Sequence, residues 1–205
     1  TRQDPAQRAT LALTVKAPAE FQVQASGRAP FIRHAMSTDV RAFQLDRPSP
    51  PFLYAFVVGK FEVAQVDLPG VSVQALGPPG HDLTQALEAA AGAGQYIYQH
   101  LARHNSGYTQ VFVHGDVAQE AAGMALISEL KRDPNDDWVF THELAHQLFG
   151  WLVPCTDFAD FWLNEGFATF LVAAVKEARQ GRGAYEAEVA RWRVRSADVH
   201  AKGRD

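Results

Sequence analysis

The sequence has little of several features that mark specialised classes of protein. Its 205 residues include one cysteine, Cys155, which excludes an internal disulfide and a cysteine cluster for a metal. The 19 basic and 23 acidic side chains are spread along the chain and leave no basic stripe for nucleic acid. The longest strongly apolar run, residues 167–175, is shorter than the roughly 20 residues that cross a bilayer, and no signal-peptide pattern opens the chain. We therefore expect no nucleic-acid partner and no membrane segment, whereas compartment and oligomeric state do not follow from composition.

The order of the elements predicts an α+β fold. Apolar and polar residues alternate over residues 10–25, and apolar runs at 52–63 and 71–76 also predict strands. Longer periods then predict a helix over 83–103, with Asp82 as its N-cap. Further segments follow: a buried strand at 109–114 and helices at 135–150, 161–180 and 184–199. Strands that come first and helices that come last favour α+β over an alternating α/β fold.

The most informative pattern is His142-Glu143-x-x-His146, followed after eighteen residues by Glu165. On a helix, positions i and i+4 lie one above the other, so both imidazoles can reach one ion. Glu143 emerges about 100° around the helix, beside the metal, where it can activate a metal-bound water. Glu165 would be the third ligand and would leave the fourth tetrahedral position open. The pattern predicts a one-ion zinc site and hydrolytic chemistry.

The alternative is an amphipathic helix with ordinary histidines. With 8 histidines and this glutamate content, a random order of the residues would contain the three-residue pattern about 0.015 times. A suitably placed Glu165 on a second helical segment makes coincidence a still poorer explanation.

The residues around this pattern closely resemble the aminopeptidase-N-like zinc metallopeptidases, which are gluzincins and include leukotriene hydrolase. The resemblance rests on HELAHQLFG at residues 142–150 and WLNEGFAT at 162–169. In addition, YAFVVGKFE at 54–62 is similar to the segment that joins that family's N-terminal β domain to its catalytic domain.

The resemblance implies two parts: residues 1–66 as the end of an N-terminal β domain, and residues 67–205 as a thermolysin-like catalytic domain that lacks its C-terminal portion. It implies that His142, His146 and Glu165 bind zinc and that Glu143 is the general base. Asn164 and Asp160 are candidates to bond the distal imidazole nitrogens, with helix capping or surface polarity as the alternative.

Two departures from the family pattern concern substrate binding and catalysis. The family has Gly-x-Met-Glu-Asn before the zinc helix, and its glutamate holds the substrate's amino terminus. Here Ala125 and Leu126 follow Gly123-Met124. Glu120 would supply a carboxylate only if the loop had a different shape, and we expect it to be a solvated loop charge. The family's transition-state tyrosine lies further downstream than this chain extends, and Tyr185, early in a predicted helix, is expected to pack.

Three functions remain in view. The first is a zinc metallopeptidase acting on peptides, most simply an aminopeptidase. The second is a zinc hydrolase with an altered substrate, which the missing Glu-Asn pair permits. The third is a gluzincin-like scaffold that keeps metal for structure and binds proteins. Glu143 favours an enzyme, because a scaffold has no chemical need for a carboxylate beside the metal.

Overall fold

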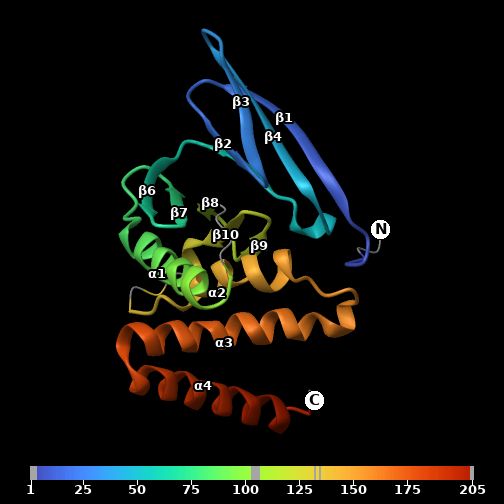
Figure 1. Ribbon diagram of the computed structural model, residues 1–205. Helices are drawn as coiled ribbons and strands as arrows, with labels where there is room; N and C mark the ends of the chain where they lie inside the picture. The colour runs from blue at the N-terminus through green and yellow to red at the C-terminus, as the bar shows by residue number, and fades with distance from the viewer. Residues whose placement is uncertain (1–3, 103–106, 132, 134, 204–205) are drawn as a thin grey trace.

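The computed structural model describes residues 4–102, 107–131, 133 and 135–203, which form three successive regions. Figure 1 shows the N-terminal strands at one end, a mixed sheet in the middle, and the two longest helices side by side at the opposite end. The metal-site candidates lie between the mixed sheet and these helices. The expected α+β class is confirmed.

The N-terminal region consists of two small antiparallel sheets. The first has the order β1 (Ala9–Pro18), β4 (Thr38–Ser49) and β3 (Arg28–His34), and the second pairs β2 (Gln22–Ala25) with β5 (Phe56–Gly59). The alternation at residues 10–25 correctly predicted β1 and β2. The sequence analysis did not predict β3 and β4. The predicted strand at 52–63 divides into a short 3-10 turn (Pro51–Leu53), β5 and the start of β6.

The middle region is a five-stranded sheet with three parallel strands at its centre. Its order is β6 (Glu62–Leu68), β7 (Val71–Gly77), β8 (Gly107–Val113), β10 (Met124–Ser128) and β9 (Ala118–Ala121). The edge strands β6 and β9 are antiparallel to their neighbours, and β7, β8 and β10 are parallel. The division into 1–66 and 67–205 stays a prediction, since residue 66 lies within β6, which already pairs with β7.

Four helices follow the predictions closely, with one exception. They are α1 (Thr84–His100), α2 (Trp138–Ala145), α3 (Phe161–Gln180) and α4 (Arg182–Ala201). The predicted N-cap of α1 is off by one residue: the cap is Leu83, although the carboxylate of Asp82 accepts a hydrogen bond from the Thr84 amide at 2.9 Å. The expected end of α1 at residue 103 lies outside the described residues. The exception is α2, which ends at Ala145 rather than near 150 and continues as a π-helical turn, Gln147–Leu152.

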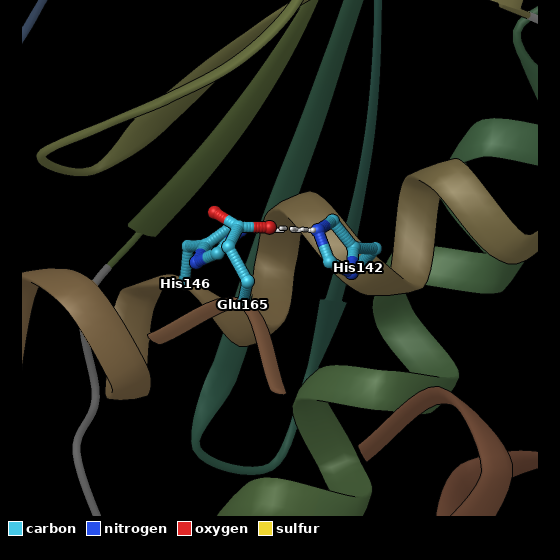
Figure 2. A group of neighbouring side chains, drawn as sticks. All are labelled: His142, His146 and Glu165. Carbon is cyan, nitrogen blue, oxygen red and sulfur yellow. Dashed lines mark hydrogen bonds and ion pairs between the residues drawn. The ribbon is translucent and has the colours of Figure 1, made fainter. Parts of the chain in front are cut away.

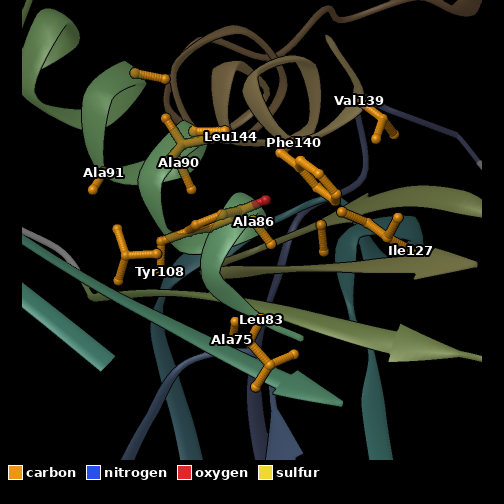
Figure 3. Close-up of a cluster of buried hydrophobic side chains, with 14 of the residues drawn as sticks. Ala75, Leu83, Ala86, Ala90, Ala91, Tyr108, Ile127, Val139, Phe140 and Leu144 are labelled. Carbon is orange, nitrogen blue, oxygen red and sulfur yellow. The ribbon is translucent and has the colours of Figure 1, made fainter. Parts of the chain in front are cut away.

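The main hydrophobic core lies where α1 and α2 cover the five-stranded sheet. Alanines on α1, including Ala86 and Ala90, let this helix approach the sheet closely, and Phe140 and Leu144 on α2 fill the space beside them (Figure 3). Phe140 and Leu144 lie four residues apart and therefore share one face of the helix. The same face carries neither His142 nor His146, so the histidines face away from this core.

The segment Phe158–Gln180, which includes α3, is long and apolar enough to span a membrane by length and composition alone. However, α3 packs against α1, α2 and α4, and it carries the buried polar side chains of Asn164 and Lys176. The core helix of a folded domain can pass the same test, so length and composition alone do not make α3 a membrane segment.

Candidate metal centre

Helix α2 positions His142 and His146 by burying the rest of its surface. All of its residues from Val139 to Ala145 are buried, and the core face described above fixes the rotation of the helix. His142 and His146 then project together toward α3, where they are only 6% and 2% exposed. Their rings lie 4.7 Å apart and nearly perpendicular, and their Nε2 atoms are 3.2 Å apart. Two nitrogen donors therefore converge on one point.

Glu165 reaches the same point from α3 (Figure 2). Ala168, one turn later, packs against Ala145 of α2, and this contact turns the Glu165 face of α3 toward the histidines. The Glu165 carboxylate lies 3.2 Å from His142 Nε2 and 3.6 Å from His146 Nε2. The hydrogen bond to His142 lowers the pKa of Glu165, despite the opposing effect of burial. The structure thus brings together the three side chains that the sequence predicted as ligands.

A break in the helix fixes the orientation of His146. Phe149 and Gly150 leave helical geometry, and Gly150 has a φ of 145°, which side chains other than glycine rarely tolerate. The break brings the Phe149 carbonyl oxygen to 3.0 Å from His146 Nδ1. A proton on Nδ1 donates to this carbonyl and leaves the lone pair on Nε2 free, as a metal ligand requires.

The expectation that Asn164 and Asp160 bond the distal imidazole nitrogens is wrong. Nδ1 of His146 bonds the Phe149 carbonyl, and Nδ1 of His142 is buried without a hydrogen-bond partner among the described residues. The Asn164 amide instead lies 3.9 Å from the sulfur of Cys155. The sequence could not show that a helix break would supply a backbone carbonyl.

Trp138, which the sequence analysis did not single out, supports His142. Its indole lies one turn earlier on α2 and stacks on the imidazole, with ring centroids 4.3 Å apart and planes 17° apart. Arg195 of α4 lies over the indole, 5.9 Å from its ring centroid. Burial lowers the pKa of His142, which favours the neutral imidazole that metal binding needs.

Glu143 lies beside the three converging groups. It is 4% exposed, and its Oε2 atom is buried without a hydrogen-bond partner among the described residues. Burial, followed by the negative charges of Glu120 and Glu165, raises the pKa of Glu143 to about 8. A carboxylate in this setting has a strong affinity for a proton, which is the property of a general base.

Glu120 is also in the site, so the expectation of a solvated loop charge is wrong. It lies on the edge strand β9, is 7% exposed, and places a carboxylate oxygen within 4.8 Å of donor atoms of Glu143 and His146. Burial raises its pKa, and the charge of Glu165 adds to this effect. No local pattern in the sequence marks Glu120 as buried, because its burial follows from the position of β9 beside α2.

Tyr185 lies away from these groups, at the start of α4. The guanidinium of Arg182 lies over its ring at 4.5 Å from the centroid. This is the packing role that the sequence predicted for Tyr185.

The chemistry of the converging donors suits zinc. Two neutral imidazoles and one carboxylate form a donor set that occurs in zinc sites with three protein ligands and one open position. The donor atoms of His142, His146 and Glu165 all lie within 4.8 Å of one another. The residues present therefore fit the ion that the sequence predicted.

Comparisons with known proteins agree with this geometry. Residues 124–204 match the family model described as the peptidase family M1 domain. Over 95 residues the chain is 30% identical to leucine aminopeptidase 2 of Ajellomyces capsulatus, which corresponds to 46% of this chain and 15% of that protein. It also matches the crystal structure of an M1 zinc metallopeptidase from Deinococcus radiodurans, with a TM-score of 0.75 and 25% identity over 94% of this chain.

A crystal structure of a single-residue mutant from the same organism gives a TM-score of 0.74 at 24% identity, which supports the fold. The chain spans 46% of the length of each of these two solved proteins. The resemblance seen in the sequence is therefore confirmed, and residues 124–204 match part of that family's domain.

Proposed function

We propose that the chain holds the metal centre of a zinc-dependent peptidase that removes amino-terminal residues from peptides. His142, His146 and Glu165 would hold one zinc ion. The observation that carries this proposal is the convergence of their donor atoms, with the buried carboxylate of Glu143 immediately beside them. A relative that is 30% identical over 95 residues is named leucine aminopeptidase 2, and this name supports the same class of reaction.

Bound zinc would supply a Lewis acid that polarises the scissile carbonyl and increases the acidity of water. Glu143 would take a proton from the attacking water and donate it to the departing amine. Its unpartnered Oε2 is available for that proton, and burial keeps bulk water from competing for the carboxylate. The Phe149 carbonyl would hold His146 in the required tautomer during the reaction.

Glu120 would bind the free amino group of the substrate. A buried carboxylate needs a positive partner, and a substrate ammonium group can supply it. Glu120 lies beside Glu143, so an amine held there is close to the position of hydrolysis. This arrangement favours cleavage of the first peptide bond, because an amine fixed at Glu120 leaves room for one residue before the metal.

The altered-substrate hydrolase and the protein-binding scaffold are the alternatives. By its position in the site, Glu120 corresponds to the glutamate of the family's Glu-Asn pair. Ala121 stands where the asparagine would follow. This difference would change how the substrate terminus is held, and it gives the altered-substrate reading its support. The buried, unpartnered Glu143 argues against a scaffold, in which such a group would be destabilising without benefit.

The test measures zinc content and cleavage of one fluorogenic peptide, with a free and with an acetylated amino terminus, using the protein that carries this sequence. Glu143→Gln should keep its zinc and lose activity by about 10²–10⁴-fold. Glu120→Gln should keep its zinc and lose about 10- to 100-fold in cleavage of the free peptide only. Glu88→Gln, on the exposed side of α1, is the matched control and should match the parent protein.

Each result separates the candidate functions. Zinc-dependent cleavage of the free peptide alone supports an aminopeptidase, and cleavage of both peptides supports a hydrolase with relaxed specificity. Zinc binding without cleavage of either peptide would favour the scaffold. Full activity in Glu143→Gln would contradict the proposed base.

A further inference from the structure

The β9–β10 turn that follows Glu120 is not one of the turn types that two-residue hairpins favour. Ala121 pairs with Met124, so Ala122 and Gly123 are the two central residues of the turn. Two-residue hairpins favour turns with a positive φ at the first or at both central positions. Here only Gly123 has a positive φ, of 77°, and contacts from outside the hairpin must therefore stabilise the turn.

Gln147 supplies two of these contacts with a single side chain. Its Oε1 accepts a hydrogen bond from the Gly123 amide at 2.8 Å, and its Nε2 donates to the Ala121 carbonyl at 3.1 Å. The side chain is 9% exposed, so these bonds are protected from competition with water. Backbone bonds from Ala122 to Leu53 and from Thr109 to Gly123 hold the turn on its other sides.

The Gln147 side chain links the region of the metal-ligand candidates to the region of Glu120. Gln147 directly follows the zinc-ligand candidate His146, and Ala121 directly follows Glu120. The side-chain bridge therefore joins the neighbour of a metal ligand to the neighbour of the carboxylate. It crosses between the π-helical turn after α2 and the edge of the sheet, which are far apart in the sequence.

Glu120 needs such a restraint because it lies among other carboxylates. Its carboxylate is beside Glu143, and Glu165 adds a further negative charge, which His146 opposes. The side-chain amide of Gln119 donates to the Glu120 carboxylate, but Gln119 is on the same strand and does not tie β9 to the rest of the site. Strand β9 has four residues and pairs only with β10, because it is the edge of the sheet. A short edge strand held on one side can shift and move a repelled carboxylate toward solvent.

We propose that Gln147 is a positioning residue that holds Glu120 at the distance from the metal ligands needed to bind a substrate amino group. The proposal rests on the proposed function of Glu120 and adds the element that sets its position. Gln147 itself does not contact the substrate. The specificity for a free amino terminus thus depends on the first residue of the π-helical turn, directly after the ligand candidate His146.

The test is binding of leucine amide and of N-acetyl-leucine amide to the zinc-free and zinc-loaded protein, measured by calorimetry together with zinc content. Gln147→Met keeps the length of the side chain and removes both hydrogen bonds. It should weaken binding of leucine amide about tenfold, leave the acetylated compound unaffected and retain zinc. Gln22→Met is the matched control, because the Gln22 side chain also accepts from a backbone amide, that of Phe61, and lies in the N-terminal region; it should leave binding of both compounds unchanged.

A double-mutant cycle with Glu120→Gln separates positioning from a general loss of structure. If Gln147 acts through Glu120, Gln147→Met should cause no further loss in the Glu120→Gln background. An equal loss in both backgrounds, or undiminished preference for leucine amide in Gln147→Met, would overturn the proposal. If Gln147→Met does not fold, Gln147→Glu serves instead, since it keeps the acceptor for Gly123 and loses the donor to Ala121.

Failure of the proposed function gives a different pattern. In that case Glu120→Gln alone would leave the preference for leucine amide unchanged, whatever Gln147→Met does. If Glu120→Gln abolishes the preference and Gln147→Met preserves it, the role of Glu120 stands and only the inference about Gln147 is wrong.

Discussion

Replacing Lys176 with methionine removes the centre of a buried ionic cluster that joins α3 and α4 to the segment before α2. The Lys176 ammonium donates to Asp136 at 2.6 Å, before α2, and to Glu188 of α4 at 2.7 Å. Lys176 and Glu188 are 8% and 2% exposed. The substitution leaves the Glu188 carboxylate buried with less positive charge around it, and the helices that carry the metal ligands lose a shared anchor.

The size of the effect follows from what remains after the substitution. Removing one partner of a buried ion pair costs about 3–5 kcal/mol. Nη1 of Arg191 still bonds Asp136 at 2.5 Å and Glu188 at 3.0 Å, so part of the charge stays compensated. We therefore expect the lower end, about 3 kcal/mol in the free energy of unfolding. For a chain of this size the loss corresponds to a Tm lower by about 6–12 °C.

Urea unfolding followed by far-ultraviolet circular dichroism, with calorimetry for the Tm, measures this loss. The double variant Lys176→Met/Glu188→Leu should be more stable than Lys176→Met, because it removes the carboxylate that the single variant leaves buried. Lys202→Gln, which removes an exposed ion pair with Asp198, is the control and should leave the Tm unchanged. An unchanged Tm in Lys176→Met, or a double variant no more stable than the single one, would refute the reasoning.

Three further predictions concern the metal and pH. Chelation of zinc should lower the Tm of the parent protein, because the metal binds only the folded site. The Tm of Glu165→Gln should fall much less on chelation. Equal Tm shifts in the two proteins would contradict Glu165 as a ligand. Trp138→Leu should weaken zinc binding by about tenfold in a chelator competition titration, because the imidazole of His142 loses the ring stacked against it; unchanged affinity would show that the stacking does not position the ligand. Burial opposes ionisation of Asp136, but Lys176 and Arg191 outweigh this effect and hold the pKa of Asp136 below the ordinary 3.8. The ionised carboxylate therefore stabilises the fold at pH values above 3.8, and this stabilisation is lost as the pH falls through the lower pKa of the folded protein. The Tm should therefore fall below about pH 4 in the parent and less steeply in Asp136→Asn, and parallel pH profiles would contradict this.

The local patterns that the sequence analysis used depend on short-range geometry, and these predictions were the accurate ones. Residues His142 and His146 share a helix face because of helical periodicity alone, and α3 begins and ends where the sequence predicted. Helix α3 ends at Gly181, whose φ of 88° is a backbone conformation that favours glycine. The sequence analysis missed strand β3 because β3 is exposed throughout and has no alternation of buried and exposed residues.

The tertiary structure decided which groups surround the predicted ligands. The burial of Glu120 depends on strand β9 lying at the sheet edge beside α2, and no local pattern encodes that approach. The Phe149 carbonyl reaches His146 only because the helix breaks at Gly150. The sequence by itself predicted the three candidate metal donors, since the spacing of the two histidines within a helix is a local property, whereas the buried carboxylate and the Gln147 bridge arise from segments that meet only when the chain folds.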